Sequence, residues 1–220
     1  VVPWSVPPVV APAPGAGTEV RRRHGLGDRR FVLYPAIAYL HKNHAVLLAA
    51  VAAMGRDGGA PVDLVLTGAA GPLDAAVAER AAAPDLAGRV HVLGRVPAGD
   101  LAALLAEADA VAVPSRYEGF GLPALEALAA GRPTVVADAG SLPEVVDGAA
   151  LVVDPDDVEG WAAALRIAVD DPAERARLVD AGLAVAASGT PERTATALID
   201  VWLRCLGGDE TPPRTVRNPS

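Results

Sequence analysis

Cysteine is almost absent from this sequence, since Cys205 is the only one among 220 residues. A single thiol excludes an intramolecular disulfide framework and cysteine-rich metal modules, and it fits a reducing compartment. Long hydrophobic runs are missing too, because the longest, from Ala45 to Gly55, is far shorter than the roughly 20 residues of a membrane span. We find no secretory signal pattern. We therefore expect a cytoplasmic protein, with any membrane contact made peripherally through a longer protein.

Lysine is equally scarce: Lys42 is the only one, and the other 18 of the 19 basic side chains are arginine. The net charge of -8 argues against a nucleic-acid-binding surface, which needs a surplus of positive charge. A local basic cluster from Arg21 to Arg30 could touch anionic lipid or phosphate, although a solvated helix or loop explains it better. The single lysine, Lys42, is therefore the basic residue that we consider as a candidate functional residue.

Hydrophobic residues make up 51% of the chain, which is enough to bury a sizeable core. From Phe31 onward, short apolar runs alternate with longer periodic segments. The runs read as strands at Phe31–Tyr34, Val62–Thr67, Val90–Leu93, Ala110–Val113, Thr134–Ala137 and Leu151–Val153. Helices are expected near 44–56, 73–82, 99–107, 122–130, 142–147, 157–170, 172–187 and 191–206. Strands that are apolar on both faces predict a single α/β domain with a doubly wound, Rossmann-like parallel sheet covered by helices.

The loop after the fourth predicted strand combines glycines with carboxylates. Gly119 and Gly121 allow a sharp turn with bare N–H groups, and a helix then begins, so the loop could hold a phosphate. Glu118 lies in the loop and Glu126 lies one turn into the helix, eight positions later. Two carboxylates that face one crevice would accept hydroxyl hydrogen bonds. Together these features favour a polyhydroxylated, phosphorylated ligand such as a nucleotide sugar.

Lys42 follows the first predicted strand, at or just before a helix N-terminus. A cation is unfavourable there unless an anion binds beside it, and an ammonium group is a common phosphate partner. In doubly wound sheets, ligands bind beyond the carboxyl ends of the strands. The sequence therefore predicts that Lys42 and the loop around Glu118 share one site.

These motifs together resemble the C-terminal domain of family 4 glycosyltransferases of the GT-B fold. The resemblance covers roughly Phe31 to Leu206. Its most specific part is the pair of glutamates eight residues apart around the Gly-Phe-Gly-Leu-Pro loop. The other matching segments are Lys42-Asn43, Gly94, Gly131 to Ala137, Leu142 to Val146 and Thr190 to Ala195.

The resemblance implies a retaining, metal-independent enzyme that takes its sugar from a UDP- or GDP-sugar and needs no cofactor. In that case Glu126 would hold the ribose hydroxyls and Glu118 would lie against the donor sugar. Lys42 would neutralise the leaving diphosphate. The loop residues that would meet the sugar or diphosphate are Gly119, Phe120, Gly121 and Leu122, and those beside the base are Gly94, Arg95 and Val96.

Two departures from the family pattern stand out. Many members carry an Arg shortly before the phosphate Lys, whereas Tyr34 to Ile37 hold none, so Arg116 is a candidate replacement. Whole enzymes also have an N-terminal acceptor-binding domain, which we expect to be missing from this chain.

The expected organisation follows from that second departure. Residues 1–17 would be a linker from the missing domain, 18–190 the donor-binding domain, 191–207 a helix crossing to the missing domain, and 208–220 a mobile tail. Without its partner, the crossing helix would expose Leu198, Ile199, Val201, Trp202 and Leu206.

Two alternatives remain open. The chain could bind nucleotide sugars without turnover, or it could be a nucleotide-sugar epimerase of the same overall fold. The Asp-x-Asp spelling at Asp154 to Asp156 suggests a metal site of another transferase fold, but a helix N-cap beside it explains the acidic run better. His41 and His44 bracket Lys42 without the spacing of a metal site, so we interpret them as loop and helix-start residues.

Overall fold

The computed structural model describes residues 11–56 and 58–206 of the chain. Its centre is a sheet of six parallel strands in the order β3-β2-β1-β4-β5-β6. The strands are β1 (Phe31–Pro35), β2 (Asp63–Thr67), β3 (Val90–Gly94), β4 (Ala110–Val113), β5 (Thr134–Ala137) and β6 (Leu151–Val153). The predicted Rossmann-like α/β fold is confirmed.

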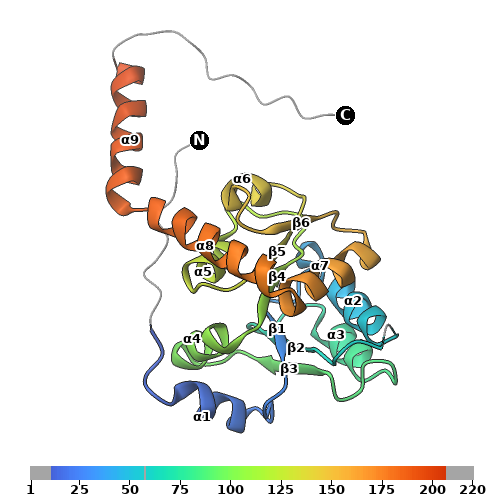
Figure 1. Cartoon of the computed structure of the whole chain (residues 1–220). Helices are drawn as coiled ribbons and strands as arrows, with labels where there is room; N and C mark the ends of the chain where they lie inside the picture. The colour runs from blue at the N-terminus through green and yellow to red at the C-terminus, as the bar shows by residue number, and fades with distance from the viewer. Residues whose placement is uncertain (1–10, 57, 207–220) are drawn as a thin grey trace.

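Helices cover both faces of the sheet (Figure 1). On one face lie α2 (His44–Arg56), α3 (Asp74–Ala81) and α7 (Val158–Asp170), with α2 packed on α7. The opposite face carries α1 (Ala16–Arg23), α4 (Ala98–Glu107) and α5 (Leu122–Ala129), and α8 (Pro172–Ser188) packs over α5. The short α6 (Leu142–Val146) lies against α5 and β5. Each predicted helix is present, with ends within two residues of the expected ones.

Burial separates the inner strands from the two edges. Every residue of β2, β4 and β5 is buried, and so is β1 up to Tyr34. The edge strands β3 and β6 are only partly covered, with Val92 and Val152 exposed. The two edge strands, β3 and β6, are therefore less covered than the inner strands, although both are mainly apolar as predicted, because an edge strand has a neighbour on one side only.

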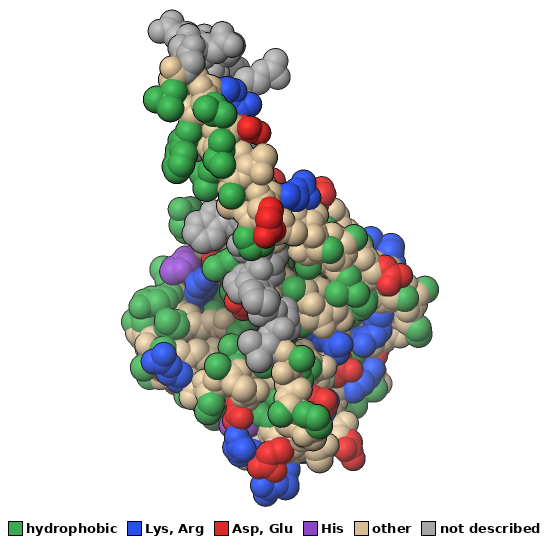
Figure 2. All heavy atoms as spheres, turned by 90° about the vertical axis from the view of Figure 1, so that its left-hand side faces the viewer, with side chains coloured by type: hydrophobic (Ala, Val, Ile, Leu, Met, Phe, Trp, Pro, Cys, Tyr) green, Lys and Arg blue, Asp and Glu red, His purple; other side chains and the backbone are tan. Residues whose placement is uncertain are grey.

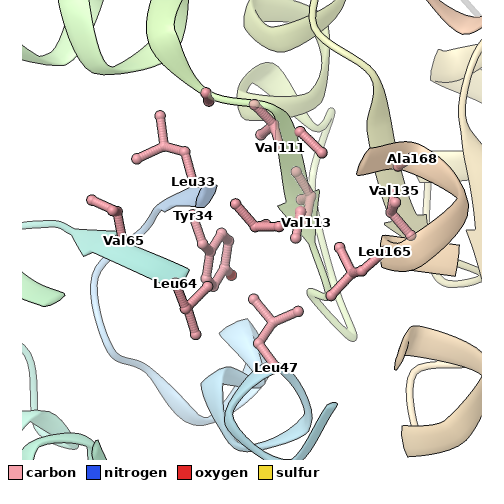
Figure 3. Packing of buried hydrophobic residues seen from close by; sticks show 14 of the residues in the cluster. Leu33, Tyr34, Leu47, Leu64, Val65, Val111, Val113, Val135, Leu165 and Ala168 are labelled. Carbon is pink, nitrogen blue, oxygen red and sulfur yellow. The ribbon is translucent and has the colours of Figure 1, made fainter. Parts of the chain in front are cut away.

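The core lies between the sheet and its helices. In Figure 3, Tyr34 of β1 lies among Leu64, Leu47 and Val113, which come from β2, α2 and β4, whereas Leu33 points to the other face of the sheet, the side of Val65 and Val111. Each fully buried leucine contributes roughly 1.5–3 kcal/mol of transfer free energy. A buried tyrosine among these aliphatic side chains places one hydroxyl group at the carboxyl end of the sheet.

The strand order reverses direction between β1 and β4. Chain order runs outward from β1 through β2 to β3, and outward again from β4 through β5 to β6. At such a switch point the following loops diverge, and open α/β sheets bind their ligands in the crevice beyond the carboxyl ends of the strands there. The loops after β1 and β4 contain Lys42 and Glu118, so the topology itself brings the two predicted segments together.

The basic segment near the start of the described chain is not a freely solvated stretch. Val20 of α1 and Leu26 are buried, and α1 packs against α4. Each of the clustered arginines pairs with a carboxylate: Arg21 with Glu107, Arg22 with Glu19, Arg23 with Asp100, Arg29 with Asp63 and Arg30 with Asp170. This pairing leaves less charge for a lipid surface than the sequence suggested.

The last helix, α9 (Pro191–Leu206), projects away from the body of the protein (Figure 1) and contains no buried residue. Figure 2 shows hydrophobic side chains gathered along it. The exposed ones are Leu198, Ile199, Trp202, Leu203 and Leu206. Val201 is half-buried, so the predicted apolar patch holds for the other four residues named from the sequence. The expected linker start at 1–10 and the expected tail at 208–220 lie outside the described residues.

Candidate functional site

The two predicted segments meet in an ion pair at the switch point. Lys42 ends η1 (Leu40–Lys42), the short 3-10 helix that follows β1, and its Nζ donates to Glu118 Oε1 at 2.6 Å. The Lys42 side chain is 18% exposed and the Glu118 side chain is 11% exposed. The structure therefore brings the two predicted segments together, although the sequence did not predict that Lys42 and Glu118 would pair directly.

The residue after Lys42 anchors the loop to a third strand end. Asn43 has a left-handed backbone (φ 53°), a conformation that asparagine tolerates better than most residues. Its Nδ2 donates to the carbonyl of Pro155, 2.8 Å away in the loop after β6. Asn43 is also buried, so this bond is shielded from water. The backbone beside Lys42 is thus tied to the loop after β6.

The loop after β4 ends in the N-terminus of α5. Gly121 has a φ of +86° and caps the helix, and Pro123 lies in the first helical turn. The backbone amides of Gly119, Gly121 and Leu122 donate no hydrogen bond to another described residue. Unpaired amides at a helix N-terminus attract anions. The half-buried Phe120 lies between them and packs against the core.

A second contact holds Glu118 from the other side. Ser141 Oγ donates to the backbone carbonyl of Glu118 at 3.2 Å. The neighbouring Gly140 has a φ of +58° and passes so close that an added Cβ would lie 3.3 Å from the Glu118 amide nitrogen. The turn after β5 therefore helps to define where Glu118 lies.

Glu126 lies half-buried on α5. Burial raises the pKa of its carboxyl group above the ordinary value. Its carboxylate has no hydrogen-bonded or ion-paired partner within residues 11–56 and 58–206. A partly desolvated carboxylate of this kind is a strong acceptor for ligand hydroxyl groups.

The guanidinium group of Arg116 forms an ion pair with a carboxylate in the loop after β6. It pairs with Asp156 and lies 3.5 Å from Asn43 Oδ1. Since Asp156 compensates its charge, Arg116 positions the loop after β6 in this structure rather than adding free positive charge. Asp157, the residue after Asp156, accepts a hydrogen bond from Gly160 N at 2.9 Å at the start of α7. The predicted helix N-cap is therefore confirmed.

The residues expected beside the base lie further out. Gly94 ends β3 with a φ of +64°, and β2 separates that strand from β1. Arg95 is exposed and Val96 is half-buried against the core. Their position at the same edge of the sheet is compatible with the outer part of a long ligand, and their role stays a prediction.

The histidines around Lys42 differ in burial. His41 is exposed and stacks on Tyr39, with ring centroids 5.7 Å apart. His44 is buried beside Tyr34 and lies 3.3 Å from the carbonyl of Ala36.

No group of three or more His, Cys, Asp or Glu side chains that could hold a metal ion occurs in the part of the chain that the structure describes. Nor does that part include a helix long and apolar enough to cross a membrane.

The sequence did not predict the side-chain contacts that hold the site together. Tyr34, Asn43, Ser115 and Ser141 all contact the segments that carry Lys42 or Glu118. Tyr34 could have been noticed, because it is a hydroxyl-bearing side chain in a strand that is otherwise apolar. Asn43 was noted only as part of the matching Lys42-Asn43 segment. Ser115 and Ser141 carry no signal in the sequence, since their role depends on which strands become neighbours.

The parallel sheet in the order β3-β2-β1-β4-β5-β6, with helices on both faces, places the chain among the Rossmann-like α/β domains. The family model described as "Glycosyl transferases group 1" matches residues 17–184. The chain therefore belongs to this family, and its sheet corresponds to the C-terminal domain of a GT-B glycosyltransferase.

Individual relatives agree with the family. The O-antigen chain mannosyltransferase B of Escherichia coli is 33% identical over 190 residues, which cover 86% of this chain and 50% of that protein. Sucrose-phosphate synthase from Thermosynechococcus elongatus has a TM-score of 0.73 at 26% identity, covering 94% of this chain and 53% of its own. HepE from Anabaena, in complex with UDP and glucose, has a TM-score of 0.77 at 21% identity, with coverage of 93% and 55%. The chain thus spans about half the length of these proteins.

Proposed function

We propose that this chain is the donor-binding half of a retaining, metal-independent family 4 glycosyltransferase that uses a UDP- or GDP-sugar. The observation that carries the proposal is the contact between Lys42 and Glu118 at the switch point, beside the unpaired amides at the start of α5. Membership of the glycosyl transferase family supports it. So does the binding of UDP and glucose by HepE, a protein of the same fold.

The proposed roles follow from the charges. In glycosyl transfer, the bond between the anomeric carbon and the β-phosphate oxygen breaks, and the diphosphate leaves with the electron pair. The acceptor oxygen bonds to that carbon and gives up its proton. Lys42 and the amides of Gly119, Gly121 and Leu122 would stabilise the negative charge that builds on the diphosphate. Glu118 would lie on the side of Lys42 away from the diphosphate and would face the donor sugar.

Glu126 would take the ribose. A carboxylate accepts two hydroxyl hydrogen bonds, which suits the neighbouring 2′ and 3′ hydroxyl groups of a nucleotide. Its lack of a described partner means that no existing bond must be broken first. Gly94, Arg95 and Val96 would lie on the side of the base.

Calorimetry tests the proposal directly. We expect the chain to bind one of UDP, GDP, UDP-glucose and GDP-mannose, and Glu126→Ala to weaken that binding by about tenfold or more, as for loss of a hydrogen-bonded charged group. Glu159→Ala is the matched control, because Glu159 is 77% exposed on α7. Absence of binding to all four compounds, or equal losses in both variants, would contradict the proposal.

The alternative of a binding module without turnover is favoured by one observation: the chain covers half of the mannosyltransferase that it resembles. Both functions use the same pocket. Release of nucleoside diphosphate from the donor and an acceptor separates them, since a module without turnover would bind the donor and release none.

A further inference from the structure

A ladder of hydrogen bonds joins η1 to the loop after β4. At one rung, Arg116 N donates to His41 O at 2.8 Å. At the next, the Tyr34 hydroxyl lies 2.7 Å from Lys42 O and 3.2 Å from Ser115 Oγ. The last rung is the ion pair of Lys42 with Glu118.

The direction of the bonds in the middle rung follows from their chemistry. A backbone carbonyl only accepts, so Tyr34 must donate its single hydroxyl proton to Lys42 O. The Ser115 hydroxyl must then donate to the Tyr34 oxygen. Burial raises the pKa of the Tyr34 phenol, so that the group keeps its proton at any ordinary pH. Two hydroxyl groups in series, Ser115 and then Tyr34, therefore form a chain of hydrogen bonds to the backbone carbonyl of Lys42.

Both hydroxyl groups are shielded from water. Tyr34 and Ser115 each have a relative exposure of 0%. In Figure 3 the Tyr34 ring lies among Leu64, Leu47 and Val113, which leaves its position little freedom. A hydroxyl on a ring held in the core is a fixed point to which a surface loop can be fastened.

The three rungs differ in what a ligand would do to them. A diphosphate that binds Lys42 competes with Glu118 for the ammonium group, because both partners are anionic. The rungs through His41 and Tyr34 bind backbone atoms and can stay in place. Tyr34 therefore holds the Lys42 backbone whether or not the ion pair to Glu118 persists.

We propose that Tyr34 is a positioning residue for diphosphate binding: its hydroxyl, with that of Ser115, fixes the backbone from which Lys42 reaches the phosphates. The inference rests on the proposed function. It predicts an effect on the phosphate part of a nucleotide and none on the nucleoside part, because Lys42 serves only the former.

The experiment compares nucleotide and nucleoside binding by calorimetry. UDP or GDP, whichever the chain binds more tightly, is titrated beside uridine or guanosine. We expect Tyr34→Phe to weaken the diphosphate about fivefold, the fold-change that loss of one neutral hydrogen bond brings, and to leave the nucleoside unchanged. In a Lys42→Ala background, Tyr34→Phe should cause no additional loss, since positioning residues act through the group they position.

A matched control separates positioning from general destabilisation. Thr134 is also fully buried, and its hydroxyl donates to Arg132 O at 2.9 Å at the opposite end of the sheet. Thr134→Val therefore removes a comparable buried bond far from the crevice, and it should change neither affinity. If thermal melting shows that Tyr34→Phe does not fold, Ser115→Ala is judged by the same criteria.

The possible results are distinct. Failure of the wild-type chain to bind either diphosphate would overturn the proposed function and this inference with it. If the wild type binds, equal losses for diphosphate and nucleoside would overturn the inference alone. So would an unchanged diphosphate affinity, a comparable effect of Thr134→Val, or a further loss in the Lys42→Ala background.

Discussion

Glu126 combines burial with the lack of a described partner, and the two have opposite consequences for stability and binding. Because burial raises the pKa of its carboxyl group, the folded state holds the proton more tightly than the unfolded chain. Folding is therefore penalised once pH rises above the normal range of a carboxyl group and Glu126 must ionise. A residue that costs stability while serving a ligand is a common feature of binding sites.

We expect Glu126→Gln to raise the melting temperature at pH 7 by roughly 1 °C while it weakens nucleotide binding. The gain should vanish at pH 4, where the wild-type carboxyl group is protonated. Thermal unfolding at the two pH values, together with calorimetry, measures both effects. A melting temperature that falls at pH 7 would show that the carboxylate stabilises the fold.

His44 predicts a pH dependence of the opposite kind. Burial lowers the pKa of His44 from 6.5; the hydrogen bond to the Ala36 carbonyl and the charge of Asp74 act in the opposite direction but are smaller, and the charge of Lys42 adds slightly to the lowering. Because the folded state favours the neutral ring, its stabilisation is complete above pH 6.5 and is lost as pH falls through the depressed folded value. We expect melting temperatures to drop between pH 7 and 5, and His44→Phe to reduce that drop by roughly 2 °C.

The exposed His41 is the control for this effect, because His41→Phe should leave the pH profile as it is. Identical pH profiles of the melting temperature for the wild type and His44→Phe would contradict the role assigned to His44.

At the residue scale, the sequence identified Lys42, Glu118 and Glu126 as candidate site residues. It could not show that Lys42 bonds to Glu118 or that Tyr34 supports both loops, since those contacts join residues up to 81 positions apart.

At the scale of elements, the start of α5 depends on one glycine more than on the other. Gly121 has a φ of +86°, and an added Cβ would lie 2.8 Å from Leu142 Cδ2 on α6. Gly119 has an ordinary φ and no atom within 4 Å of an added Cβ. The two glycines look equivalent in the sequence, but only Gly121 is required by the geometry.

Gly121→Ala should therefore destabilise the chain by about 2 kcal/mol, from the left-handed backbone and the contact with Leu142. Urea denaturation monitored by circular dichroism gives this free energy. Gly119→Ala is the matched control and should change stability by less than about 0.5 kcal/mol. Similar losses in both variants would refute the distinction.

Elements with strong local patterns were predictable, and those stabilised by distant partners were not. The inner strands are continuous apolar runs, and their ends differ from the prediction by one residue at most. In contrast, α1 buries only Val20, and Arg21 beside it bonds to Glu107, which is 86 residues away. Its hydrophobic pattern alone was too weak to separate a helix from a loop. The same holds for η1, which is three residues long.

At the scale of the whole molecule, α9 adds length without adding to the core. None of its residues is buried, whereas α8 buries Leu178 and packs over α5. We expect a chain that ends at Thr190 to melt within about 2 °C of the wild type, because little apolar surface is lost. A chain that ends at Asp171 also loses α8 and should melt at least 5 °C lower, or fail to fold. A loss of 5 °C or more on removal of α9 alone would show that α9 contributes to the fold, and a loss within about 2 °C without both helices would show that α8 does not.

The scarcity of lysine gives the crevice a chemical label of its own. Apart from the α-amino group, Lys42 carries the only amine in the chain. An acylating reagent that modifies amines would therefore react at the α-amino group and at one side chain, and that side chain is 18% exposed and held by Glu118. Any compound that covers Lys42 would slow the reaction at this side chain. Occupancy around Lys42 could thus be followed by peptide mass spectrometry, which separates the Lys42 peptide from the N-terminal one, on the unmodified sequence.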